Sequence, residues 1–150
     1  YENVSFPLRE HRKDLSEEQM RQLVREKLQI VGLKNVEEKF PSDLSGGMRK
    51  RVGLARAIVM DPKIVLYDEP TTGLDPITTD YVDEMILDAK KQLGVTSVVI
   101  SHDIASAFKV ADNIAFLYQG VIVDQGHPST LRHSQHPAVK LFLSTWFGKN

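Results

Sequence analysis

The sequence predicts an α/β protein with a partial parallel sheet, a helical subdomain and a C-terminal β-hairpin with helices. Two apolar runs of strand length, at 63–67 and 95–100, enclose a helix-forming stretch. That order is typical of parallel strands joined by a right-handed crossover. The first 45 residues show no strand pattern, and residues 113–126 have the alternation of two paired strands.

The composition is that of a globular domain with a core. Hydrophobic residues make up 41% of the 150 residues, charged residues make up 26%, and the formal net charge is −1. A net charge near zero gives no overall attraction to nucleic acid. Cysteine is absent, which excludes disulfides and thiolate zinc sites. No apolar run approaches the roughly 20 residues of a membrane span.

The N-terminal third is expected to hold one irregular segment and one amphipathic helix. Residues 1–15 are charged and irregular, so we expect no helix or strand there. Ser16 and Gln19 have the spacing of a capping box, which starts a helix. Apolar residues then recur with a 3.6-residue period as far as Val31. Gly32 is expected to end this helix.

The next two elements are a helix and a strand. The helix is expected from about Gly46 to Met60, with Ser45 as its cap and Asp61-Pro62 as its end. KIVLY at 63–67 is expected to be a strand buried on both faces, because it is short and wholly apolar apart from its lysine.

A second helix and a second buried strand follow. Asp75-Pro76 is a strong helix start, because the carboxylate caps the helix and proline suits the first helical position. This helix is expected to reach about Leu93 and to end at Gly94. VTSVVI at 95–100 is expected to be the second strand with both faces buried.

The C-terminal part is expected to contain a short helix, a hairpin and a helical tail. Asp103 should cap a helix that reaches about Ala111. Residues 113–126 then predict two strands around the tight turn Gln119-Gly120. The tail at 128–146 is expected to be helical.

Acidic side chains follow the first predicted strand. Ligands of open α/β sheets bind at the carboxyl ends of the strands, where Asp68 and Glu69 lie. Asp68 is suited to bind Mg²⁺, which prefers hard oxygen ligands and keeps its waters. Glu69 could orient or deprotonate a water molecule. The alternative interpretation is an ordinary acidic surface turn.

A histidine follows the second predicted strand, within Ser101-His102-Asp103. Since both strands end at the same edge of the sheet, His102 should face the same crevice as Glu69 and could contact a developing phosphate charge. The alternative is a helix cap at Asp103 with an incidental histidine.

Two glycines stand at the start of the helix predicted from residue 46. Backbone N–H groups at a helix N-terminus bind anions, and Gly46 and Gly47 would allow a close approach. Ser45 adds a hydroxyl donor. This indicates a phosphate site without a basic side chain, and the alternative is a flexible loop.

Four motifs occur together in the order LSGGM (44–48), IVLYDE (64–69), TTGLD (71–75) and SHD (101–103). In that order they resemble the signature motif, Walker B strand, D-loop and switch histidine of the ATP-binding subunits of ABC transporters. The resemblance implies a P-loop NTPase-like fold, an ATPase activity, and ATP with Mg²⁺ as cofactors.

The resemblance also implies roles for individual residues. Asp68 would serve Mg²⁺, Glu69 would polarise the attacking water, and His102 would touch the γ-phosphate. Two subunits of this family pair head to tail and enclose two ATP molecules. The signature residues Ser45, Gly46, Gly47 and Met48 would therefore face the ATP held by the second copy, and Asp75 would lie at the seam between the two sites.

The sequence departs from the family pattern in two places. Met48 replaces the usual glutamine of the signature motif, and no G-x-x-x-x-G-K-[ST] phosphate loop occurs in the 150 residues. We therefore expect the C-terminal part of a cassette, inactive alone, with a helical signature subdomain at about 8–60 and the C-terminal part of the α/β core at 61–150. The family's phosphate-loop strand would lie between the strands at 95–100 and 113–118, and without it both should expose unpaired edges and promote self-association.

A finer resemblance concerns the transported substrate. YENVSFPLREH at 1–11, LSGGM and TTGLDPI resemble the ATPases of the Mce-type phospholipid transporters, a group linked to toluene tolerance. This implies a second ATPase copy and a membrane permease as partners, at the cytoplasmic face of the inner membrane. The alternatives are a generic importer ATPase for amino acids or metals, and a non-transport ABC ATPase acting on nucleic acid. The basic run MRKR at 48–51 is interpreted as a solvated helix face rather than a nucleic-acid site.

Overall fold

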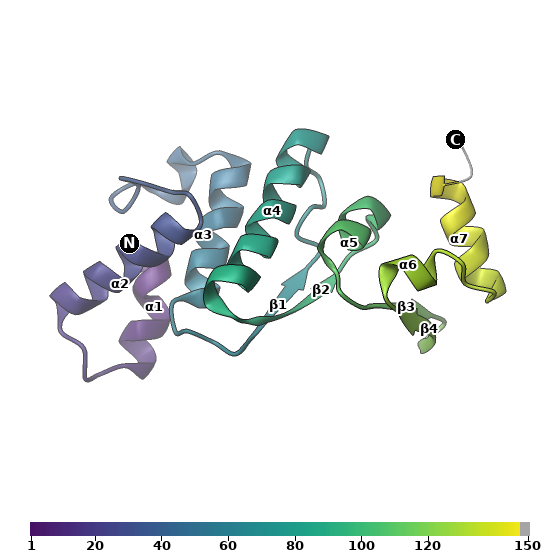
Figure 1. Ribbon diagram of the computed structural model, residues 1–150. Helices are drawn as coiled ribbons and strands as arrows, with labels where there is room; N and C mark the ends of the chain where they lie inside the picture. Colours follow the sequence, from purple (N-terminus) through teal and green to yellow (C-terminus); the bar gives the residue numbers. More distant parts are fainter. Residues whose placement is uncertain (148–150) are drawn as a thin grey trace.

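The N-terminal part of the computed structural model, which describes residues 1–147, is entirely helical (Figure 1). It contains α1 (Glu2–His11), α2 (Glu17–Ile30), the 3-10 helix η1 (Pro41–Asp43) and α3 (Gly46–Ile58). The capping box at Ser16 is confirmed, since Ser16 and Gln19 each bond the other's backbone N–H. Helix α2 ends two residues before Gly32, which has a φ of +70°.

Helix α1 is the first correction, because residues 1–15 were expected to be irregular. Pro7 lies inside α1 and removes one backbone donor, which is why the local sequence argues against a helix. The helix nevertheless buries Val4 and Leu8, each 1% exposed, and packs against α2 and α3. Tertiary packing of this apolar face outweighs the local cost of the proline.

Strands β1 (Ile64–Asp68) and β2 (Thr96–Ile100) pair in parallel, with α4 (Pro76–Leu93) between them in sequence. The register pairs Leu66 with Val98 and Asp68 with Ile100, so both strands end at the same level. Helix α4 starts after Asp75 and ends at Gly94 with a φ of +62°, as expected from the sequence.

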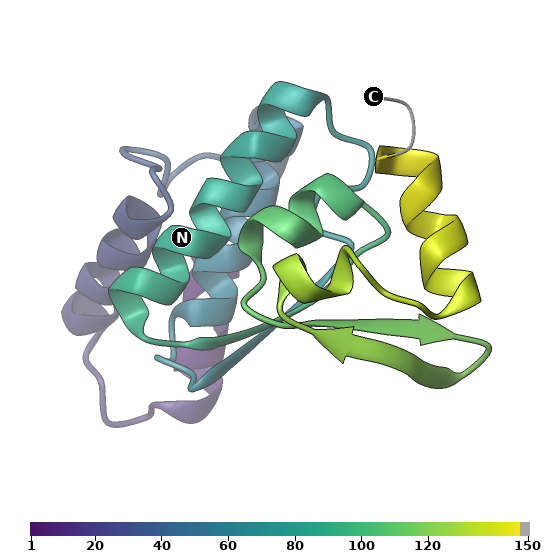
Figure 2. The ribbon, with the colours of Figure 1, turned by 45° about the vertical axis from the view of Figure 1, so that its right-hand side comes forward.

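The expectation that both strands are buried on both faces is wrong. In β1, Val65 and Tyr67 are buried, whereas Ile64 and Leu66 are 58% and 75% exposed. Strand β2 has the same alternation and is nowhere fully buried. The helices α4 and α5 lie on one side of the strands (Figure 2), and no described element covers the other side.

The C-terminal part contains α5 (Ile104–Val110), β3 (Ile114–Tyr118), β4 (Val121–Gly126), α6 (Pro128–Leu131) and α7 (Pro137–Phe147). The predicted hairpin is confirmed, and both turn residues have positive φ, +50° at Gln119 and +81° at Gly120. Two positive φ values suit a tight two-residue hairpin. The helical tail is interrupted between α6 and α7, because Pro137 disfavours helical backbone at the residue before it.

The four strands form two separate two-stranded sheets. Among residues 1–147, β2 pairs only with β1, and β3 pairs only with β4. The expected open edges at 95–100 and 113–118 are therefore present in the fold. The division at about residue 60 into a subdomain and a core part stays a prediction, because one hydrophobic cluster runs from α1 through α3 to β1 and α4.

No helix within residues 1–147 is long and apolar enough to cross a membrane.

Candidate functional site

The carboxyl ends of β1 and β2 bring Glu69 and His102 into contact. Because Asp68 and Ile100 are register partners, the residues that follow them emerge side by side. The backbone N–H of Glu69 donates to the carbonyl of Ile100 at 2.9 Å, which extends the ladder by one bond. His102 Nδ1 lies 2.8 Å from Glu69 Oε2. Residues 33 positions apart are thus brought into contact.

The loop after β1 holds the Glu69 side chain in place. Glu69 has a φ of +47°, which is uncommon for a residue other than glycine. The hydroxyl of Thr72 donates to Glu69 Oε2 at 2.8 Å, and the N–H of Thr72 donates to the Glu69 carbonyl at 3.3 Å. A non-glycine residue in this conformation is held by its surroundings and is often found at functional sites.

The contact between the two side chains shifts both of their pKa values. The hydrogen bonds from His102 and Thr72 lower the pKa of the Glu69 carboxyl. The same contact with Glu69 raises the pKa of the His102 imidazole. Glu69 is therefore held as a carboxylate, and separating it from His102 would make it a stronger base. His102 remains accessible to a ligand, because its side chain is 72% exposed.

Asp68 is the last residue of β1 and is exposed. No group of three or more potential metal-binding side chains occurs in the part of the chain that the structure describes. Mg²⁺ in nucleotide sites is commonly bound by one or two carboxylates, with phosphates and water completing the shell. A single exposed carboxylate at this strand end fits that mode of binding.

The start of α3 presents backbone donors without side chains in front of them. Ser45 caps the helix by accepting a hydrogen bond from the N–H of Met48 at 3.3 Å. A Cβ added to Gly47 would lie 3.5 Å from Thr78 Cγ2, and one added to Gly46 would lie 4.0 Å from Arg49. These are ordinary contact distances, so no contact within residues 1–147 requires the two glycines. They fit a helix start that an anion approaches from outside.

Met48 and Asp75 both have structural contacts within the chain. Met48 is partly buried and packs against the main hydrophobic cluster. The Asp75 carboxylate accepts hydrogen bonds at 3.0 Å from the N–H groups of Ile77 and Thr78 and at 2.6 Å from the Thr78 hydroxyl. The Thr78 hydrogen bonds lower the pKa of the Asp75 carboxyl. Asp75 is thus the N-cap of α4, as its sequence position predicted.

The basic run at 48–51 is solvated in part, because Arg49 is exposed, whereas Lys50 and Arg51 are half-buried and bind backbone carbonyls. Lys50 Nζ donates to the carbonyls of Pro70 at 2.7 Å and Thr72 at 3.1 Å, which ties α3 to the loop that holds Glu69. Arg49 donates to the carbonyl of Leu44 and Arg51 to that of Gly32. Sequence reasoning missed Lys50, because a long-range contact to backbone carbonyls leaves no local pattern.

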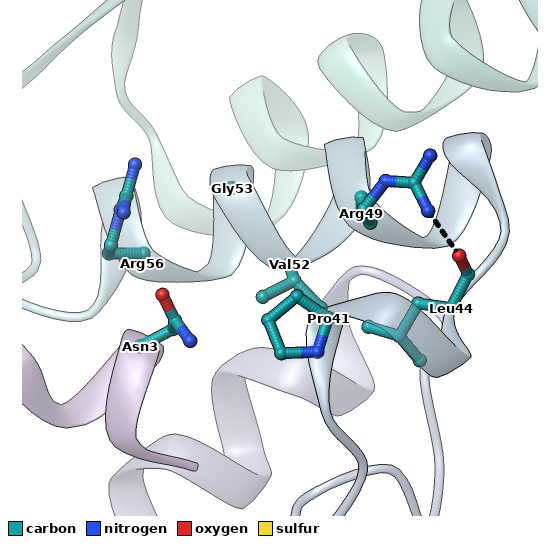
Figure 3. A pocket seen from close by; sticks show the side chains of 7 residues that line it. All are labelled: Asn3, Pro41, Leu44, Arg49, Val52, Gly53 and Arg56. Carbon is teal, nitrogen blue, oxygen red and sulfur yellow. Dashed lines mark hydrogen bonds between the residues drawn. The ribbon is translucent and has the colours of Figure 1, made fainter.

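A shallow groove of about 140 Å³ lies between α1, η1 and α3 (Figure 3). Asn3, Pro41 and Val52 line it, with Arg49 and Arg56 at either end. None of the residues predicted to bind nucleotide or metal lines this groove.

Comparison with known proteins points to one family. Residues 2–72 match the family described as ABC transporter. The chain is 46% identical over 144 residues to the probable ribonucleotide transport ATP-binding protein Mkl of Mycobacterium leprae, covering 96% of this chain and 41% of that protein. It is 40% identical over 143 residues to the intermembrane phospholipid transport system ATP-binding protein MlaF of Escherichia coli, covering 95% of this chain and 53% of that protein. The chain spans about half, or less, of the length of these curated relatives.

Solved structures show the same fold. The chain superposes on cbiO1 from Clostridium perfringens, part of the ABC transporter complex cbiONQ, with a TM-score of 0.80 and 29% identity, covering 97% of this chain and 57% of that one. For the ATP-binding cassette MJ0796, in a dimeric post-hydrolysis state bound to ADP and Pi, the TM-score is 0.71 and the identity 32%, covering 85% of this chain and 55% of that one.

These findings confirm both the predicted α/β fold class and the predicted likeness to phospholipid transport ATPases. Residues 2–72 match the ABC transporter family, and nearly the whole chain is similar to ATP-binding proteins of ABC transporters.

Proposed function

We propose that this chain supplies the signature, Walker B and switch elements of a subunit that hydrolyses ATP to drive transport. The contact between Glu69 Oε2 and His102 Nδ1, at 2.8 Å across the ends of two parallel strands, is the observation that carries this proposal. It places a carboxylate and an imidazole where α/β proteins bind ligands. Phosphoryl transfer depends mainly on such positioning and on charge stabilisation.

Each site residue has a proposed role in this reaction. Glu69 orients the attacking water and accepts its proton, and His102 donates a hydrogen bond to the γ-phosphate. Asp68 holds Mg²⁺ directly or through water; the metal, when bound, neutralises phosphate charge. Separation of His102 from Glu69 on nucleotide binding would restore the basicity of the carboxylate, because their contact lowers its pKa.

The second part of the proposal is a head-to-tail pair of ATPase subunits. The start of α3, from Ser45 to Met48, would face the ATP held by the second copy, and Asp75 would lie at the seam. Support comes from Gly46 and Gly47, which no contact in the described part of the chain requires. The subunit would bind a membrane permease at the cytoplasmic face of the inner membrane.

Phospholipid is the cargo that we propose. The 40% identity to MlaF, named as part of an intermembrane phospholipid transport system, supports it. A second candidate is a ribonucleotide, because Mkl, at 46% identity, is named a probable ribonucleotide transport protein. The two candidates are distinguished by comparing the uptake of labelled phospholipid with that of labelled ribonucleotide in vesicles that contain the whole transporter. ATP-dependent movement of the ribonucleotide alone would overturn the phospholipid assignment.

Glu69→Gln tests the catalytic assignment in the intact protein. The amide keeps the size and the hydrogen bond from Thr72 but cannot accept a proton, so ATP binding should persist while turnover falls by about 10²–10⁴-fold. Glu38→Gln is the matched control, because Glu38 is a surface carboxylate with an 85% exposed side chain. Wild-type turnover in Glu69→Gln would show that another group is the base.

Ser45→Arg tests the subunit pairing. A bulky cation at the start of α3 should block approach of the second copy but leave nucleotide binding by each subunit intact. We expect ATP-dependent dimerisation, followed by light scattering, to disappear together with turnover. Unchanged turnover in this variant would remove the cross-subunit role of α3.

A further inference from the structure

A buried hydrogen bond joins α4 to α5. The Ser106 hydroxyl on α5 donates to Asp83 Oδ1 on α4. Asp83 is 3% exposed and Ser106 is 2% exposed. A buried carboxylate is costly unless it is hydrogen-bonded, so this pair holds the two helices in one arrangement.

The same serine is connected to the turn that carries His102. The Ser106 N–H donates to Asp103 Oδ1 at 3.1 Å, and the Asp103 N–H donates to Ser101 Oγ at 3.0 Å. His102 lies between Ser101 and Asp103. Hydrogen bonds through Ser106 and Asp103 therefore connect Asp83 on α4 to the two residues that flank His102.

We propose that Asp83 is a positioning residue that, through Ser106, holds the 101–103 turn so that His102 meets Glu69. The role rests on the proposed ATPase function, for which His102 is a contact of the γ-phosphate. Helix α4 starts directly after Asp75, so Asp83 also places the His102 turn relative to the loop at the proposed subunit seam.

The surroundings of Asp83 explain why its hydrogen bond matters. Lys109 lies nearby on α5, but its ammonium group is bound to Asp80 at 2.5 Å and Glu84 at 2.7 Å. Burial raises the pKa of the Asp83 carboxyl, and the Ser106 hydroxyl opposes that shift. Loss of the hydroxyl would leave a buried acceptor without its donor and loosen the first turn of α5.

Ser106→Ala in the intact protein is the test, with Lys109→Gln as the matched control. Lys109 also joins α4 to α5, but through the exposed carboxylates of Asp80 and Glu84 rather than through Ser106. Two properties are measured: the pKa of His102 by NMR, assigned with His102→Gln, and kcat and KM for ATP. A merely structural bond would not move the His102 pKa.

We expect Ser106→Ala to return the His102 pKa toward its ordinary value and to lower kcat by about 10- to 100-fold at unchanged KM. Lys109→Gln should keep the wild-type His102 pKa. Asp83→Asn, which keeps a hydrogen-bond acceptor for Ser106, should match the wild type in both measurements.

An unchanged His102 pKa in Ser106→Ala would overturn the proposal, as would an equal shift in Lys109→Gln. A lowered His102 pKa in Asp83→Asn would show that the charge, not the hydrogen bond, is responsible. The pKa measurement needs no turnover. If His102→Gln and Glu69→Gln retain wild-type turnover, the ATPase assignment fails while the positioning of His102 is still decided by NMR.

Discussion

Replacing Leu8 with alanine tests whether α1 is held in the fold by its apolar face. Leu8 is 1% exposed and belongs to the cluster that joins α1, α2 and α3. The proline inside α1 weakens the helix by itself, so packing must supply its stability. Phe6 on the same helix is 61% exposed and provides a matched control.

The expected loss follows from the burial of the side chain. Truncating a fully buried leucine removes its transfer free energy and leaves a cavity, which together cost about 2–5 kcal/mol. We take about 3 kcal/mol for Leu8, a value within this range. For a chain of this length, each kcal/mol lowers Tm by about 2–4 °C, so Leu8→Ala should lower it by about 6–12 °C.

The assay is urea and thermal unfolding followed by far-ultraviolet circular dichroism. Leu8→Ala should shift the transition by this amount, and Phe6→Ala should change the free energy of unfolding by less than about 0.5 kcal/mol. Equal losses in the two variants would refute the packing explanation of α1.

Three other results are expected. Gly94→Ala, at a φ of +62°, should destabilise the protein by about 1–2 kcal/mol. Gly53→Ala, in open space within α3, should stabilise it by about 0.5–1 kcal/mol. Changes of the same sign in the free energy of unfolding, measured with urea, would contradict this pair of predictions. Glu69 raises the pKa of His102. The stability due to this contact is therefore present below the ordinary imidazole pKa and is lost as pH rises through the pKa of His102 in the folded protein. NMR titration of His102 should show the raised pKa, and an unchanged pKa in Glu69→Gln would be inconsistent with this explanation. The chain of residues 1–150 should self-associate through its open strand edges and faces, as measured by light scattering at tens of micromolar. Leu66→Lys should reduce this self-association, and a strictly monomeric wild type would count against the prediction.

Much of the fold could be predicted because helix caps and tight turns are local. Ser16, Ser45, Asp75 and Asp103 each accept hydrogen bonds from backbone N–H groups within three residues. The partners of such bonds are neighbours in the sequence, so their spacing is visible there. The Gln119-Gly120 turn was predicted for the same reason, since it lies directly between two strand patterns and Gly120 readily adopts positive φ.

The chemical identity of the candidate site was also visible in the sequence. Asp68, Glu69 and His102 each follow an apolar run of strand length, and parallel strands place such residues at one edge. Their contact distance and their opposite pKa shifts depend on the register between β1 and β2. Register is set by the packing of the sheet against helices, not by either strand alone.

The sequence by itself determined the N-caps of α2, α3, α4 and α5, and which residue types stand at the strand ends. Only the tertiary structure decided that residues 2–11 form a helix, that one face of β1 is open, and that Lys50 binds the Glu69 loop. The physical reason is the separation of the interacting residues along the sequence: a helix cap needs a partner within three residues, whereas burial needs partners from distant segments. Whether an apolar side chain is covered depends on which elements pack over it, and that arrangement exists only after the chain has folded.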